Sequence, residues 1–159
     1  MSKINLTALF CLISFFSFSQ KTISYTIAEI KACGITLNRN VGYDSSNVPI
    51  DTIYFLIGRD NRYSQLFEYI SLKTGSIQSI YDLLKKSYDF VNAELPGTST
   101  IYKHNYLSVE KVMGVNTKYI DIYASNEKGS KGYTGIDAYR IKKLMTLIEG
   151  YCSRKSIKL

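Results

Sequence analysis

Two polar segments of the sequence carry the side chains best suited to bind a ligand. The first is GRDNRYS, residues 58–64, whose central residues are Arg59, Asp60, Asn61, Arg62 and Tyr63. Arginine can hold a carboxylate or phosphate through two parallel hydrogen bonds, and tyrosine offers a rigid ring with one hydroxyl. Asp and Asn are also common turn formers. The segment is therefore either a binding loop or a solvated turn.

The second polar segment is NEKGSKGYTG, residues 126–135. Its glycines allow a ligand to approach closely, and we expect Lys131 and Tyr133 to contribute to binding. The chain has 14 tyrosines and no tryptophan. Tyrosines on strands are ordinary sheet surface, whereas those in loops beside a cation are better candidates for stacking on a sugar or packing at an interface.

Acid–base catalysis would need two carboxylates that converge in space. The candidates are Asp60, Glu68, Asp82, Asp89 and Asp121. Their spacing in the sequence does not bring any pair together. The sequence contains neither a G-x-S-x-G nucleophile elbow nor a phosphate-binding P-loop. These features favour a protein without catalysis, and a small hydrolase that uses carboxylates is the alternative.

Histidine and cysteine give little support for a metal or cofactor site. His104 is the single histidine, and the spacing of Cys33 and Cys152 differs from the short paired spacing of zinc sites. We predict no metal and no cofactor. The two cysteines could form one disulfide in an oxidising compartment. Cys152 also follows Ile141 and Ile148 at helical spacing, so it could instead be a small buried apolar residue.

The elements that must position these residues follow from hydrophobic periodicity. The expected strands of the first half are residues 22–38 (one or two strands, interrupted at Gly34), 51–58 and 65–72. The last two predict a hairpin around GRDNRYS. Residues 39–49 are rich in turn formers and predict a loop. Apolar residues then recur at three- and four-residue intervals, which predicts a helix that Ser76 can cap.

The second half repeats this outline. Its expected strands lie within residues 100–108, 108–114 and 118–125. Residues 126–135 read as a loop, and Thr134 with Asp137 resembles a capping box before the final helix. We predict an α+β fold with one antiparallel sheet and two amphipathic helices on one of its faces. The two halves share no repeat at the level of residues.

The first residues predict export. Lys3 precedes an apolar stretch at residues 4–16, and Ser17 and Ser19 suit a cleavage site. The stretch is shorter than the roughly 20 residues that span a bilayer. We therefore expect residues 1–19 to be a cleaved signal peptide and residues 20–159 to form one globular domain without a membrane span. The expected location is the periplasm or the extracellular space.

The positive net charge favours an acidic partner, and the alternative is that it only keeps an exported protein soluble. The chain carries +7, and residues 127–159 alone carry +5. Because no dense basic run is present, we do not expect nucleic acid as a partner. We predict a small binding protein whose partner is another envelope or secreted protein, or an anionic glycan. An inhibitor or immunity protein for a secreted enzyme is a special case of this prediction.

Overall fold

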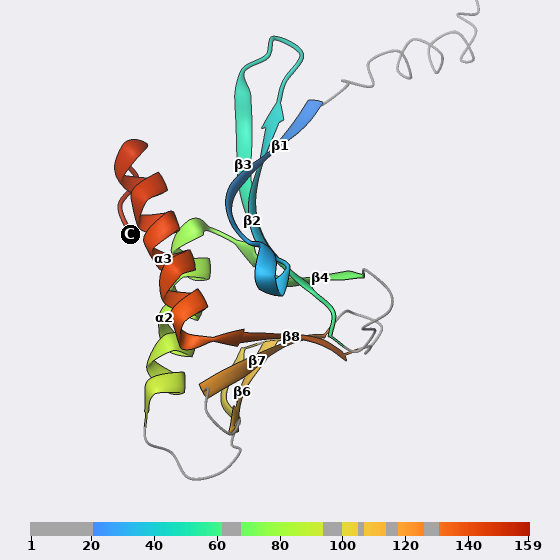
Figure 1. Cartoon of the computed structure of the whole chain (residues 1–159). Coiled ribbons are helices and arrows are strands. Elements are labelled where there is room, and N and C mark those ends of the chain that lie inside the picture. Colours follow the sequence, from blue (N-terminus) through green and yellow to red (C-terminus); the bar gives the residue numbers. More distant parts are fainter. Residues whose placement is uncertain (1–20, 62–67, 94–99, 105–106, 114–117, 126–130) are drawn as a thin grey trace, which may run out of the picture.

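The structure, a computed structural model, describes residues 21–61, 68–93, 100–104, 107–113, 118–125 and 131–159. Within these residues the chain forms two four-stranded antiparallel sheets and two long helices (Figure 1). The α+β class agrees with the prediction. The single sheet that the sequence suggested is wrong, because the strands divide into two sheets. The predicted signal peptide lies outside the described residues.

Each sheet is a meander in which every strand pairs with the next one along the chain. The first sheet contains β1 (Lys21–Ile30), β2 (Ile35–Tyr43), β3 (Pro49–Arg59) and β4 (Tyr69–Gly75). The second contains β5 (Thr100–His104), β6 (Leu107–Met113), β7 (Lys118–Ser125) and β8 (Lys131–Asp137). The helix α2 (Ile77–Asn92) follows the first sheet and α3 (Ala138–Arg154) follows the second. The two halves thus share an order of four strands and a helix.

The hairpin of β2 and β3 is longer than the sequence predicted. Residues 39–43 were expected in a loop, but they continue β2 and pair with β3. The turn that follows is fixed by Asp44, whose Oδ1 accepts hydrogen bonds from the backbone N–H groups of Ser46 (2.9 Å) and Val48 (2.8 Å). The far part of this hairpin projects beyond the helices (Figure 1) and leaves Ile50 and Ile53 exposed.

Each helix begins at a side-chain cap. Ser76 caps α2 as predicted, because its Oγ accepts from the N–H of Ser79 at 3.1 Å. The cap of α3 is Asp137, whose Oδ1 accepts from the N–H of Arg140 at 2.8 Å. Thr134 was expected to begin this helix. It lies instead within β8, so the helix starts one turn later than predicted.

The two helices pack against each other and against both sheets. Their buried side chains join those of both sheets in one hydrophobic cluster. Its largest fully buried members are Ile35, Leu37, Leu56, Ile80, Leu83, Leu84, Ile120, Ile122, Ile136, Ile141 and Leu144. Burying each such side chain contributes about 1.5–3 kcal/mol, so this shared core holds the sheets and helices in place. Among the described residues, no helix is long and apolar enough to cross a membrane.

Candidate functional site

The segment GRDNRYS begins inside a strand. Gly58 and Arg59 end β3, and the N–H of Asp60 donates to the carbonyl of Glu68 at 2.9 Å, which confirms the predicted β3–β4 hairpin. Asp60 is 0 % exposed, so it has no surface with which to contact a ligand. Asn61 is exposed. Arg62 and Tyr63 lie outside the described residues.

The two polar segments that the sequence singled out meet in the structure. The N–H of Asn61 donates to the carbonyl of Tyr133 at 2.8 Å. The chain just after β3 therefore contacts the outer edge of β8 at this point. Tyr133 is half-buried, and its ring centroid lies 5.3 Å from that of Tyr123. Lys131 is the first residue of β8. Residues 131–135 were predicted to lie in a loop, but they form part of this strand.

Two glycines in β8 leave room for neighbouring side chains to lie against this strand. A Cβ on Gly132 would lie 2.6 Å from Oδ2 of Asp60, and a Cβ on Gly135 would lie 3.0 Å from Oδ1 of Asp121. Residues three apart in a strand point to opposite faces. Asp60 and Asp121 thus lie on opposite sides of β8, and the strand separates these two candidate acid–base groups.

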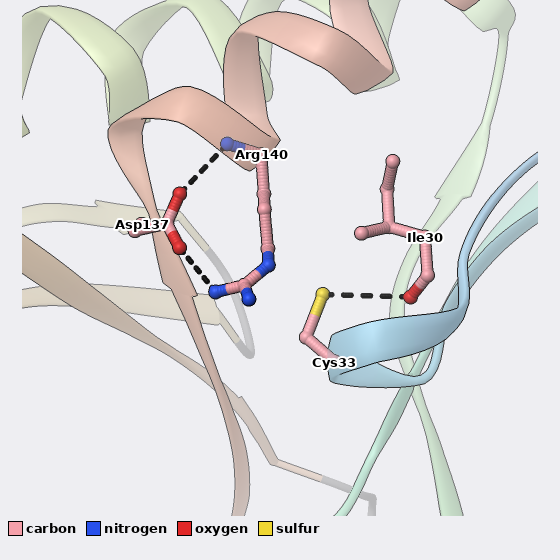
Figure 2. Close-up of polar contacts among 4 residues, drawn as sticks. All are labelled: Ile30, Cys33, Asp137 and Arg140. Carbon is pink, nitrogen blue, oxygen red and sulfur yellow. Dashed lines mark hydrogen bonds and ion pairs between the residues drawn. The ribbon is translucent and has the colours of Figure 1, made fainter.

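The sequence left open whether Cys33 and Cys152 form a disulfide, and in the structure they do not. Cys33 and Cys152 are both free. Cys33 lies beside Arg140, which is in the first turn of α3 (Figure 2). Cys152 lies in the last turns of the same helix. The helical rise separates these two turns by on the order of 18 Å, far beyond the roughly 7 Å limit between the Cα atoms of a disulfide. Cys152 is 2 % exposed and belongs to the core, which agrees with the alternative interpretation.

An open cleft of about 490 Å³ lies between α3 and the 3₁₀ turn η1 (Lys31–Cys33) that joins β1 to β2. We call it the basic cleft. Its lining residues are Glu29, Ile30, Lys31, Ala32, Tyr139, Arg140 and Lys143. Among the described residues, no group of three or more His, Cys, Asp or Glu side chains could hold a metal ion.

The turn η1 owes its shape to Gly34. Gly34 has φ of 62°, in the left-handed region that glycine adopts without strain, and its N–H donates to the carbonyl of Lys31 at 3.1 Å. The Gly34 carbonyl accepts from the N–H of Arg59 at 3.1 Å, which ties the turn to β3. These two bonds hold the exposed Lys31 and Ala32 opposite the start of α3.

The other wall of the cleft is set by Asp137 and Arg140. The Asp137 carboxylate accepts from both the N–H and the guanidinium of Arg140 (Figure 2). The Arg140 side chain is 34 % exposed and that of Asp137 is 11 % exposed. The pair fixes the guanidinium at the cleft and offsets much of its charge. Lys31 and Lys143 are exposed and therefore supply most of the positive charge of the cleft.

Cys33 stands at the edge of this arrangement. Its Sγ donates to the carbonyl of Ile30 at 3.6 Å (Figure 2). Burial raises the pKa of the Cys33 thiol, while a backbone hydrogen bond from Ile35 and the charge of Arg140 act in the opposite direction. The net result is a thiol that stays protonated at neutral pH.

Sequence reasoning missed the basic cleft, because Lys143 and Arg140 read as the solvent side of the last helix. One signal was available. The first turns of α3 carry Arg140, Lys142 and Lys143, although acidic residues are the ones that stabilise a helix N-terminus. No sequence pattern could place Lys31 opposite them, because that depends on how β1 packs on α3.

Comparisons with known proteins add little. The chain matches no known family model and no curated protein. It is similar to a solved chain from work on SsgB and longitudinal cell division during sporulation of Streptomyces coelicolor. That likeness has a TM-score of 0.36 and 11 % sequence identity, and it covers 85 % of this chain and 91 % of the other. A likeness of this size carries no argument about function.

Proposed function

We propose that this chain is a small non-catalytic binding protein that holds an anionic ligand in the basic cleft. The observation that carries the proposal is the convergence of Lys31, Arg140 and Lys143 on one open cleft beside the exposed ring of Tyr139. Cations that converge on a concave surface attract a carboxylate or a phosphate.

The charge balance of the cleft indicates a ligand with several anionic groups. Asp137 already pairs with Arg140, so Lys31 and Lys143 provide the remaining positive charge, which Glu29 at the same cleft offsets in part. An exposed ion pair contributes only about 0–1 kcal/mol. A single carboxylate would therefore bind weakly, whereas a ligand that contacts several cations at once would bind usefully.

In this proposal the protein works in the periplasm or outside the cell. The composition of residues 1–19, with Lys3 before an uncharged apolar stretch, supports export. An exported basic protein meets acidic polymers of the cell envelope, and these are the partners that the proposal assigns to it.

Binding to two acidic polymers tests the proposal. The purified protein is titrated with polygalacturonate, which carries carboxylates, and with polyphosphate, and the neutral methyl ester of polygalacturonate serves as the uncharged reference. The double variant Lys31→Glu/Lys143→Glu is expected to weaken binding by about tenfold or more, equivalent to about 1.4 kcal/mol. The matched control is Lys85→Glu/Lys155→Glu, which changes the net charge equally at exposed positions away from the cleft.

The control variant is expected to bind as the wild type does. Equal weakening by both double variants would mean that net charge, not the cleft, attracts the polymer. Absence of binding to both acidic polymers would overturn the proposal. Binding through the cleft should also weaken as salt rises, because the Debye length falls from about 10 Å at 0.1 M to about 3 Å at 1 M.

A further inference from the structure

A second hollow adjoins the basic cleft on the outer face of α3. It has a volume of about 290 Å³ and is lined by Tyr139, Lys142, Lys143, Thr146 and Leu147. These residues recur at three- and four-residue intervals, so they lie along one face of the helix. Tyr139 and Lys143 line both hollows. The two hollows therefore adjoin, and we call them together the track.

The track is too long for a single small anion. The helical rise from Tyr139 to Leu147 is about 12 Å, and the basic cleft extends the track toward η1. Lys31 lines the basic cleft and Lys142 lines the second hollow. A ligand that fills the track must be a chain with negative groups at more than one point along it.

The other side chains of the track specify a chain rich in hydroxyl groups. Glu29 lines the basic cleft, and a carboxylate can only accept hydrogen bonds, so it would repel a ligand made of anionic groups alone. Thr146 offers a hydroxyl at the far end. Tyr139, 76 % exposed, stands where the two hollows meet and presents a ring face on which a sugar ring can lie.

Single-stranded nucleic acid fits the track less well. Proteins that bind it without sequence preference stack successive bases on several aromatic side chains. Tyr139 is the one aromatic residue among those that line the two hollows. A chain of acidic sugars needs only one such ring.

We propose that the track binds a linear acidic polysaccharide, with one sugar ring on Tyr139 and acidic groups at Lys31, Lys142 and Lys143. This inference rests on the proposed function and names its ligand class. It makes affinity keep rising with ligand length after the basic cleft is filled, which binding in the basic cleft alone would not.

A length series of oligogalacturonates, from the monomer to about six units, tests the inference. Affinity is expected to rise with each added unit until the track is filled and then to level off. Tyr139→Ala should weaken the longest oligomer by about tenfold, whereas Tyr139→Phe, which keeps the ring, should bind as the wild type does. Because Tyr139 is exposed, both variants should fold normally.

The outcomes separate this inference from the proposed function. If a short oligomer that spans only the basic cleft binds as tightly as the longest one and still depends on Lys31 and Lys143, the proposed function stands and the polysaccharide track is wrong. A thymidine oligonucleotide of equal charge that binds more tightly than the oligogalacturonate would also overturn the track, in favour of nucleic acid. If no acidic ligand depends on Lys31 and Lys143, both proposals fail.

Discussion

The hydroxyl of Thr134 donates a hydrogen bond of 2.6 Å to the backbone carbonyl of Arg59, a residue 75 positions earlier in the chain. The bond joins the end of β3 to β8 and thus links the two sheets. The N–H of Asn61 donates to the carbonyl of Tyr133 beside it, so the junction includes at least these two direct polar contacts. The first residues of the segment that the sequence suggested as a binding loop therefore connect the two sheets.

Loss of the Thr134 hydroxyl should destabilise the fold. Thr134→Val keeps the shape but leaves the partly buried carbonyl of Arg59 without this donor, and we expect a loss of about 1–3 kcal/mol in the free energy of unfolding. Thr52→Val makes the same change on the exposed part of β3 and should alter stability by about 0.5 kcal/mol or less. Urea denaturation measures both. Equal effects of the two substitutions would contradict the structural role of this bond.

Gly58 should not tolerate a side chain. A Cβ at this position would lie 2.3 Å from Oγ1 of Thr134 and 2.8 Å from Cδ1 of Leu72, so Gly58→Ala forces the two sheets apart. We expect a loss of about 1–3 kcal/mol or more.

Gly150→Ala is the matched control for Gly58→Ala. A Cβ on Gly150 would meet only the flexible end of Arg154 at 3.5 Å, within α3. Alanine there should stabilise the helix by up to about 1 kcal/mol. Denaturant midpoints compare the two variants, and a Gly58→Ala protein as stable as the wild type would show that the sheets are not in close contact at Gly58.

The helices and most strands were predictable from the sequence, because periodicity reports which side chains face a core. The fourth strand of the second sheet was not. Its glycines, Gly132 and Gly135, suggested a loop, but they lie within β8, where the side chains of Asp60 and Asp121 approach the backbone. The extension of β2 through residues 39–43 was missed for a similar reason, since turn-forming residue types occur within a paired strand.

The candidate site was less predictable than the fold. Lys31 and Lys143 come from elements more than 100 residues apart, and only the packing of β1 on α3 brings them to one cleft. Local sequence patterns report on strands and helices and contain no information about such a meeting. The polar segments that the sequence did single out, around Asn61 and Tyr133, are hydrogen-bonded to each other and do not line the basic cleft.

The two cysteines should differ in reactivity and remain unlinked. Cys33 is partly exposed, whereas Cys152 is 2 % exposed. An alkylating reagent should label Cys33 in the native protein and Cys152 only after unfolding. Since burial raises the pKa of Cys33 above its ordinary value of 9.0, its labelling should be slow at neutral pH and accelerate as the pH rises. Peptide mapping assigns the label, and a Cys33–Cys152 linked peptide would contradict the structure.

Tyr81 should make stability depend on alkaline pH. Its hydroxyl donates to the Glu149 carboxylate, which joins α2 to α3, and this bond together with burial raises the pKa of Tyr81 to about 12. The ordinary value is 10.0, so the folded state holds the proton more tightly than the unfolded state does. This contribution is complete below about pH 10 and is lost as the pH rises toward about 12.

The Tyr81→Phe variant isolates that contribution. Burial also raises the pKa of Tyr54 to about 12, and a side-chain hydrogen bond with Tyr25 raises the pKa of Tyr43, so the wild type also loses stability through these two tyrosines as the pH rises. Urea midpoints at about pH 9 and about pH 11 should therefore fall less for Tyr81→Phe than for the wild type. Tyr69→Phe, at a residue that is 58 % exposed, should fall as much as the wild type. If Tyr81→Phe and the wild type lose the same stability between these pH values, the Tyr81–Glu149 bond does not hold the two helices together.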